Sequence, residues 1–237
     1  MELKGKTIII TGAARIGQTV AEALKNQGAN LVLTYLQDAK EAGDFGLAVQ
    51  ADVSKEADVR RVVEAAKKEF GSVDGLVHMA AIYKKSPWQT LSETDWNLNM
   101  DIIAKSSFFF GKIAGDQMLQ NQGDIKGKMI FFSDWSVLAR PYTDYLAYNV
   151  AKSAVVGLTK SLAKELAPHV LVNAIAPGPM LRPPDLTEEE NTEVLSHTLL
   201  KRWGGAEEIA KGVLYLFQAD FVTGHILTID GGRTIAS

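Results

Sequence analysis

Short β-branched runs alternate with helical patterns along this chain, and this alternation limits the folds open to it more than any other feature. The predicted strands are residues 7–10, 31–35, 46–51, 76–79, 128–133, 170–175 and 225–229. The predicted helices are residues 16–24, 55–70, 92–122, 145–166, 187–200 and 206–218. Strands separated by helices of this length pair in parallel through right-handed crossovers. The sequence therefore predicts an α/β protein with a doubly wound parallel sheet, a three-layer α/β/α Rossmann fold.

One domain accounts for the whole chain, residues 1–237. A chain of this length buries one substantial core, and its 46% hydrophobic and 22% charged residues are typical of an ordered globular protein. The proline-rich segment 177–184 is too short for an interdomain linker. It follows a predicted strand, so we expect it to be a mobile flap beside a ligand site.

Composition and charge argue against several kinds of partner. The net charge of −3 and the lack of a Lys/Arg-rich tract argue against nucleic-acid binding. No run of about 18 apolar residues predicts a membrane span, and no apolar signal core follows Met1, so we expect a cytoplasmic protein. The sequence has no cysteine and its four histidines lie far apart, so no metal site is predicted.

The turn Thr11-Gly12-Ala13-Ala14-Arg15-Ile16-Gly17 joins the first predicted strand to the first predicted helix. Small residues let backbone N–H groups approach a pyrophosphate, which the positive end of the helix dipole also favours. The turn therefore predicts a dinucleotide site that includes Gly12, Arg15, Ile16 and Gly17. Taken alone, it would also fit an ordinary strand-to-helix turn with glycines for geometry.

Tyr148 and Lys152 lie four residues apart on the predicted helix 145–166, and therefore on one face of it. A phenol with a pKa near 10 needs a nearby positive charge to exchange protons near neutral pH. Lys152 can supply that charge, so the pair predicts a catalytic centre. The alternative is a Tyr and a Lys on a solvated helix face, which the position after the fifth predicted strand disfavours.

Together, several motifs resemble those of the short-chain dehydrogenase/reductases over essentially the whole chain. They are the turn at 11–17, Asp52-Val53, Tyr148/Lys152, Asn173-Ala174-Ile175-Ala176-Pro177-Gly178 and Asp230-Gly231-Gly232. The resemblance implies hydride transfer with a nicotinamide, while the Tyr148 hydroxyl donates a proton and Lys152 also holds the nicotinamide ribose. It further implies that Asp52 hydrogen-bonds the adenine. The remaining cofactor contacts that it implies are Val53, Ala80, Pro177 and Gly178.

Within that family the sequence resembles pteridine reductases and dihydromonapterin reductases. The motifs concerned are Ser133-Asp134-Trp135, Arg140-Pro141-Tyr142 and Phe221-Val222-Thr223-Gly224 followed by Asp230-Gly231-Gly232-Arg233. In pteridine reductases an Asp usually replaces the catalytic Ser, so Asp134 is the candidate for that role. The family spacing places the Ser thirteen residues before Tyr148, which here is Trp135, so a one-residue insertion is assumed. Ser136 could instead hydrogen-bond a carbonyl, and Asp134 could instead cap a turn.

Three further positions depart from the family pattern. The turn at 11–17 is one residue shorter than usual, which leaves the register of Arg15 open. His78-Met79-Ala80-Ala81 replaces the customary Asn-Asn-Ala-Gly, and this keeps small residues where the cofactor passes. The helix position that usually carries a catalytic Asn is Ile103, with Asn99 and Asp101 as the nearest polar residues. We therefore expect one polar link to the cofactor to be lost and the usual proton relay to be altered.

The end of the second predicted strand indicates which nicotinamide cofactor is used. An acidic side chain there binds the ribose diol, whereas an arginine accommodates a 2′-phosphate. This chain reads Thr34-Tyr35-Leu36-Gln37, without acid or base. Arg15 is the one positive clue, because family members that use NADP often carry a basic residue near it, so we expect NADP(H) rather than NAD(H).

Tyr83 follows the fourth predicted strand, where a flat heterocycle could stack on its ring or where it could simply pack its own loop. We expect reduction of a C=O or C=N bond of a small molecule, with a pterin as the first candidate. The alternatives are another carbonyl substrate, such as a 3-oxoacyl thioester, sugar or steroid, and a dinucleotide-binding protein with little turnover. The resemblance also implies a homotetramer, in which helices 92–122 and 145–166 pair across a two-fold axis. Surplus apolar residues on both helices, among them Phe108 and Val156, support this assembly, and burial of both helices within the monomer is the alternative.

Overall fold

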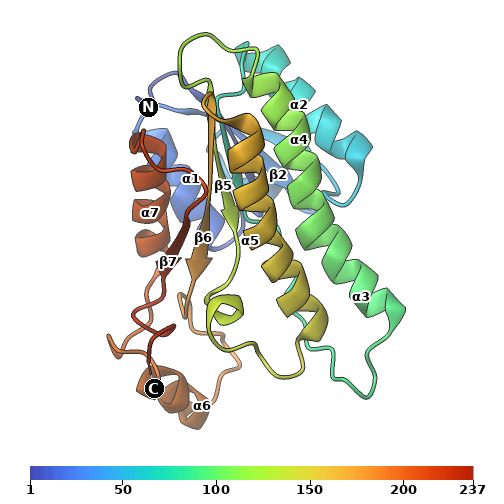
Figure 1. The fold of residues 1–237 in the computed structure, drawn as a ribbon, viewed down its shortest axis with the longest axis vertical. Coiled ribbons are helices and arrows are strands. Elements are labelled where there is room, and N and C mark those ends of the chain that lie inside the picture. The colour runs from blue at the N-terminus through green and yellow to red at the C-terminus, as the bar shows by residue number, and fades with distance from the viewer. Residues whose placement is uncertain (237) are drawn as a thin grey trace.

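Seven strands form one parallel sheet at the centre of the protein (Figure 1). The computed structural model describes residues 1–236, with the side chain of Glu41 excepted. The strands are β1 (Thr7–Thr11), β2 (Asn30–Tyr35), β3 (Leu47–Gln50), β4 (Gly75–His78), β5 (Gly127–Phe132), β6 (Val170–Pro177) and β7 (Ile226–Ile229). They lie in the order β3-β2-β1-β4-β5-β6-β7, and every neighbouring pair is parallel. The predicted doubly wound α/β fold is confirmed.

Helices cover both faces of this sheet. They are α1 (Ile16–Asn26), α2 (Glu56–Phe70), α3 (Glu93–Asn99), α4 (Ser106–Met118), α5 (Leu146–Leu166), α6 (Glu188–Ser196) and α7 (Ala206–Gln218). Helices α1 and α7 lie on one face, whereas α2, α4 and α5 lie on the other (Figure 1). None of the helices within residues 1–236 is long and apolar enough to cross a membrane.

The strands are apolar on both faces because both faces are covered. In β1, Ile8 and Ile10 pack into the core under α1 and α7, while Ile9 packs into the core under α2, α4 and α5. This alternation follows from the period of two in a strand. It explains why the strands appear in the sequence as continuous β-branched runs.

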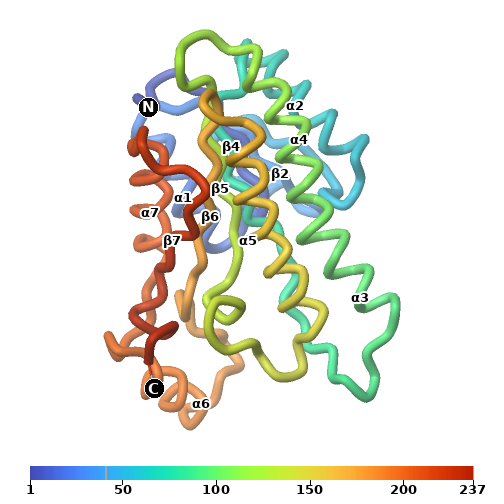
Figure 2. The backbone as a smooth tube through the Cα atoms, viewed as in Figure 1, coloured from blue at the N-terminus to red at the C-terminus, as the bar shows by residue number. Residues whose placement is uncertain are grey.

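All seven strands end at the same edge of the sheet, because all are parallel. Helix α6 and the C-terminal segment lie beyond this edge, at the lower end of the molecule in Figure 2. In open α/β sheets ligands bind outside the carboxyl ends of the strands. The fold therefore brings together the turns after β1, β4, β5 and β6.

Two helices differ from the sequence prediction. Helix α6 ends at Ser196 rather than at residue 200, and the chain then turns back toward β7. The predicted helix 92–122 contains a π-helical turn at Met100–Lys105, which separates α3 from α4. Figure 2 shows that α3 and α4 nevertheless follow one another as a continuous run.

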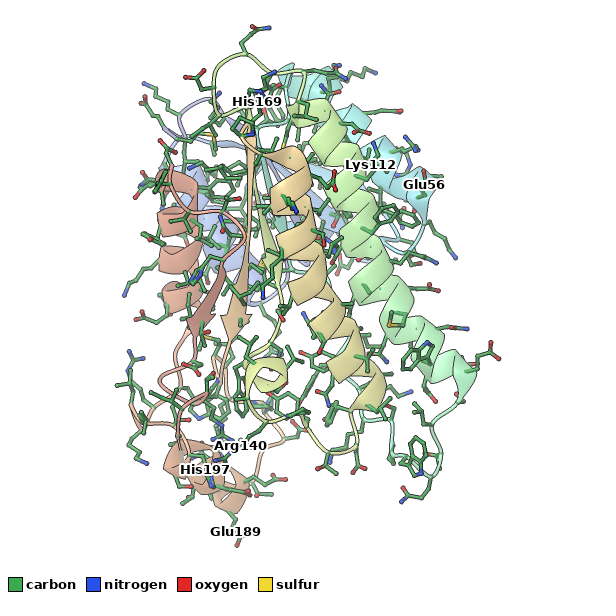
Figure 3. All side chains as sticks on the ribbon, in the orientation of Figure 1. Glu56, Lys112, Arg140, His169, Glu189 and His197 are labelled. Atoms are coloured by element: carbon green, nitrogen blue, oxygen red, sulfur yellow. The ribbon has the colours of Figure 1, made fainter. Side chains whose placement is uncertain are left out.

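The histidines do not come together in the fold. Figure 3 shows His169 at one end of the molecule and His197 at the other, and His78 is buried in the sheet. Within the described residues, no three His, Asp or Glu side chains form a group that could hold a metal ion.

Candidate active site

A cleft of about 540 Å³ opens at the carboxyl ends of the strands. The turn after β1, the ends of β4, β5 and β6, helix α5 and the segment 177–186 all contribute to its wall. The residues that line it and were singled out from the sequence are Gly12, Arg15, Ile16, Gly17, Tyr83, Asp134, Tyr148, Lys152, Pro177 and Gly178. These residues come from five separate parts of the chain and share one cavity.

The turn after β1 is tight enough to require its glycines. Gly12 has a φ of +69°, and a Cβ there would lie 2.8 Å from the backbone nitrogen of Ala80. A Cβ on Gly17 would lie 2.4 Å from the carbonyl oxygen of Gly12. Arg15 occupies the N-cap of α1 with a φ of 54°, and its exposed side chain borders the cleft. The open N-terminus of an eleven-residue helix and a close, small-residue turn fit a pyrophosphate.

Three of the predicted cofactor contacts lie outside the lining of this cleft. The backbone N–H of Ala80 donates to Thr11 Oγ1 at 3.2 Å, so Ala80 stabilises the end of β1, where the turn begins. Asp52 and Val53 follow β3, two strands away from β1. Asp52 Oδ1 already accepts hydrogen bonds from the backbone and the hydroxyl of Ser54, at 3.0 and 2.7 Å.

Tyr148, Lys152 and Asp134 form the polar centre of the cleft. The Tyr148 hydroxyl donates to Asp134 Oδ2 at 2.6 Å. The Lys152 Nζ donates to the carbonyl oxygen of Phe132 at 2.7 Å and lies 5.8 Å from the centre of the Tyr148 ring. Tyr148 and Lys152 are 5% and 4% exposed, so the pair on α5 is buried rather than solvated.

Burial and charge shift the pKa values of these groups. Burial raises the pKa of Tyr148 well above its usual value, and the Asp134 carboxylate raises it further. Burial lowers the pKa of Lys152 to about 8, against the opposing effect of Asp134. The phenol therefore holds its proton at neutral pH, while the ammonium can lose its proton just above neutral pH.

Ser136 and Ile103 do not supply polar groups to the cleft. The Ser136 side chain is fully buried, its hydroxyl has no hydrogen-bond partner among the described residues, and it is not part of the cleft wall. Its backbone N–H donates to Asp134 Oδ1 at 2.9 Å, so Asp134 caps a turn and faces Tyr148 at the same time. Ile103 is buried in the core, and neither Asn99 nor Asp101 lines the cleft.

His78 belongs to a buried hydrogen-bond chain. Its Nε2 lies 2.8 Å from Ser106 Oγ, and the Ser106 hydroxyl donates to the carbonyl of Ile102 at 2.5 Å. Ser106 must then accept from Nε2–H, so Nδ1 is the acceptor and receives the Thr11 hydroxyl at 2.8 Å. Burial lowers the pKa of His78 to about 3 and keeps the ring neutral. The chain ties the turn after β1 to the π-helical turn of residues 100–105.

An aromatic cluster forms the mouth of the cleft, and sequence analysis identified only part of it. The ring of Tyr83 stacks on Tyr145, with centroids 4.5 Å apart, and meets Tyr148 edge-on at 5.1 Å. Trp135 Nε1–H donates to the Tyr142 hydroxyl at 2.7 Å. Tyr83 is 58% exposed, so it both packs against its neighbours and offers surface to the cleft. The sequence motifs contain Trp135 and Tyr142, but the contact between the two side chains follows only from the fold.

The fold and the site together define a nicotinamide-dependent oxidoreductase. A family model described as enoyl-(acyl carrier protein) reductase matches residues 12–234. Glucose 1-dehydrogenase 2 of Bacillus subtilis is 30% identical over 99% of this chain and 96% of its own length. The 3beta-hydroxysteroid dehydrogenase 1 of Eggerthella lenta is 33% identical over 99% of this chain and 95% of its own length.

Solved structures agree with this result. A short-chain dehydrogenase/reductase from Serratia marcescens has a TM-score of 0.90 and 30% identity, over 99% of this chain and 100% of that chain. A glucose/ribitol dehydrogenase from Brucella melitensis has a TM-score of 0.91 and 31% identity, over 99% of each chain. The chain belongs to the short-chain dehydrogenase/reductase family, whose members bind a nicotinamide dinucleotide.

Proposed function

We propose that this protein uses NADPH to reduce a C=O or conjugated C=N bond of a small planar molecule, with a pterin as the preferred class. The observation that carries the proposal is the contact between the Tyr148 hydroxyl and Asp134 Oδ2, at 2.6 Å. A carboxylate beside the proposed proton donor is the feature in which the site resembles pteridine reductases. The exposed face of Tyr83 at the mouth of the cleft supports a flat substrate.

In this proposal Tyr148 gives its proton to the substrate oxygen or nitrogen. The bound nicotinamide would supply the hydride to the carbon of the same double bond. Lys152 stabilises the resulting phenolate by its positive charge. The Asp134 carboxylate accepts the Tyr148 hydroxyl and therefore sets the direction in which that hydroxyl points.

The preference for NADPH rests on Arg15 and on the end of β2. Arg15 borders the cleft and makes no salt bridge with any other residue that the structure describes. Strand β2 ends at Tyr35, without a carboxylate to repel a 2′-phosphate. A guanidinium can bind a phosphate with two hydrogen bonds.

The names of the relatives favour a second candidate, a carbonyl substrate of another kind. A sugar, a steroid and a 3-oxoacyl thioester are what those names indicate for the related proteins. Oxidation of NADPH and of NADH should be measured with dihydrobiopterin, dihydrofolate, acetoacetyl thioesters and simple ketones. Turnover of the dihydropterins alone supports the first proposal, whereas turnover of the thioesters or ketones alone supports the second. No turnover with the dihydropterins would reject the pterin as the substrate class.

We further propose that the protein is a homotetramer built through α4 and α5. These helices lie side by side over one face of the sheet and turn their outer surfaces to solvent (Figure 1). Phe108 on α4 and Val150 on α5 are 49% and 39% exposed. Exposed apolar side chains on two adjacent helices fit a symmetric interface.

A further inference from the structure

The cleft carries more positive than negative charge. The cationic side chains that line it are Arg15, Lys152 and Arg233, and its only acidic lining residue among those described is Asp134. The proposed cofactor accounts for Arg15 through its phosphate and for Lys152 through its ribose. Arg233, in the turn after β7, is the cation that the proposed function leaves unused.

Arg233 is held in a defined position. Its guanidinium carbon lies 5.1 Å from the centre of the Trp135 ring, in a cation–π contact. Its Nη1 donates to the carbonyl oxygen of Val194 on α6. A guanidinium has five N–H donors, so donors remain after this bond. Trp135 and Val194 also line the cleft, and the contact therefore fixes Arg233 at the cavity wall.

No carboxylate that the structure describes forms a salt bridge with Arg233. Asp134, the acid in the same cleft, is already occupied at both oxygens: Oδ2 accepts from Tyr148 and Oδ1 accepts from the N–H of Ser136. The Glu193 carboxylate on α6 acts on Arg233 through its charge but forms no salt bridge with it. A partly buried cation without a salt-bridge partner favours an anionic ligand. The remaining donors of a planar guanidinium suit a carboxylate or a phosphate.

From this geometry we infer that Arg233 binds an anionic group of the substrate, a carboxylate or a phosphate, while Tyr148 faces the bond that is reduced. The inference rests on the proposed function and narrows its substrate class. Aromatic contacts lead from Trp135, which Arg233 contacts, to Tyr148. The ring centroids of Trp135 and Tyr142 are 5.8 Å apart, and those of Tyr142 and Tyr148 are 6.4 Å apart. A small substrate with its acid group at Arg233 would lie along these rings.

A purely structural role for Arg233 makes a different prediction. If Arg233 only joined α6 to Trp135, its loss would weaken every ligand to the same degree. If it binds an anion, its loss would weaken only ligands that carry one. The test therefore compares ligand pairs that differ in a single charge.

Two probe pairs meet this requirement: 6-carboxypterin with 6-hydroxymethylpterin, and acetoacetate with ethyl acetoacetate. Their dissociation constants should be measured calorimetrically on the protein saturated with NADP⁺, for the wild type and for Arg233→Met, Arg233→Lys and Arg60→Met. Arg60 is a matched control, because it is exposed on α2, pairs with Glu56 and does not line the cleft. Thermal unfolding shows whether each variant is folded.

We expect Arg233→Met to weaken the charged member of at least one pair about tenfold, as for the loss of a charge-assisted hydrogen bond. The neutral member should change less than about twofold, Arg233→Lys should retain part of the affinity, and Arg60→Met should behave as wild type. The inference is overturned if Arg233→Met weakens binding of the charged and the neutral member of each pair equally. It is also overturned if the wild type binds neither charged probe more tightly than its neutral partner. If the enzyme nevertheless reduces the neutral probes with NADPH, the proposed function still holds.

Discussion

The Tyr148 hydroxyl donates a 2.6 Å hydrogen bond to Asp134 Oδ2, so the proposed proton donor is held against a carboxylate. An ionised Asp134 opposes formation of the phenolate and raises the pKa of Tyr148. The contact therefore orients the Tyr148 hydroxyl and at the same time makes its proton harder to lose.

The first prediction follows from this contact. Asn at position 134 keeps a polar group beside the Tyr148 hydroxyl but removes the negative charge that raises the pKa of Tyr148. We expect Asp134→Asn to remain active and to move the alkaline limb of the kcat–pH profile to lower pH. Tyr148→Phe should lower kcat at least about a thousandfold, because the proton donor is removed, and should leave NADPH affinity within about twofold. A Phe variant that keeps most of its activity would show that Tyr148 is not the donor.

The second prediction concerns the charge of Lys152. Because burial lowers its pKa to about 8, from 10.5 in the unfolded chain, the unfolded chain binds more protons between these values. The free energy of unfolding should therefore rise as the pH rises from about 8 to 10.5, and the cost of the buried charge is fully present below pH 8. Urea unfolding without cofactor should show this rise in the wild type and not in Lys152→Met. The Met variant should also be inactive, since it cannot stabilise the phenolate.

The third prediction concerns Arg15 and the cofactor. NADPH should bind more tightly than NADH, and Arg15→Ala should remove most of the difference by weakening NADPH alone. Fluorescence titration of both cofactors against both proteins gives the four dissociation constants. Gln18→Ala, one turn further along α1 and exposed, provides the control. Equal affinities of the wild type for the two cofactors would contradict the assignment of NADPH.

The fourth prediction concerns the assembly. Val156 is half-buried on α5, so an Asp there would place an unpaired charge in the proposed interface. Light scattering during size-exclusion chromatography should give a tetramer for the wild type and a smaller species for Val156→Asp. Lys68→Asp on the exposed face of α2 should leave the tetramer intact. A wild-type mass of one 25.8 kDa chain at micromolar concentration would rule out the tetramer.

The fifth prediction concerns His78. The folded ring stays neutral because its pKa is about 3, whereas the unfolded ring binds a proton below about 6.5. The free energy of unfolding should therefore fall as the pH falls from 6.5 toward 3. His78→Asn should lack this component of the pH dependence, since Asn does not titrate. Urea unfolding between pH 3 and 6.5 gives the dependence of the free energy of unfolding on pH for the wild type and for His78→Asn. The same dependence in both proteins would contradict a buried neutral His78 ring.

The sequence predicted the architecture because the strands and helices have clear periods. The continuous β-branched runs of β1 and β6 reflect cover on both faces, and they identify buried parallel strands. Helix ends were less predictable, because they depend on contacts made in the fold. The chain leaves α6 at Ser196 to bring Leu200 against Gly231, and no local signal at residues 197–200 marks that turn.

The site was predictable wherever one local motif carries the chemistry, as in Tyr148 with Lys152. It was less predictable where the function depends on contacts between distant segments. The loss of a polar link to the cofactor at residues 78–81 stays a prediction, and nothing in the sequence indicates that His78 connects Thr11 to Ser106. In the sequence, Arg233 was identified only as part of a motif, because its position at the cleft depends on contacts with Trp135 and with Val194 on α6, which are distant in sequence.

The π-helical turn at Met100–Lys105 also affects how this chain can be compared with its relatives. A π-turn holds one residue more than the α-helical turn it replaces, and each residue of an α-helix accounts for about 100° of rotation. Deletion of a single residue here would rotate α3 by about that angle around the helix axis relative to α4. The face that α3 presents to the rest of the protein is therefore set by the length of this turn, and positions on α3 and α4 correspond one to one only with relatives that share the extra residue.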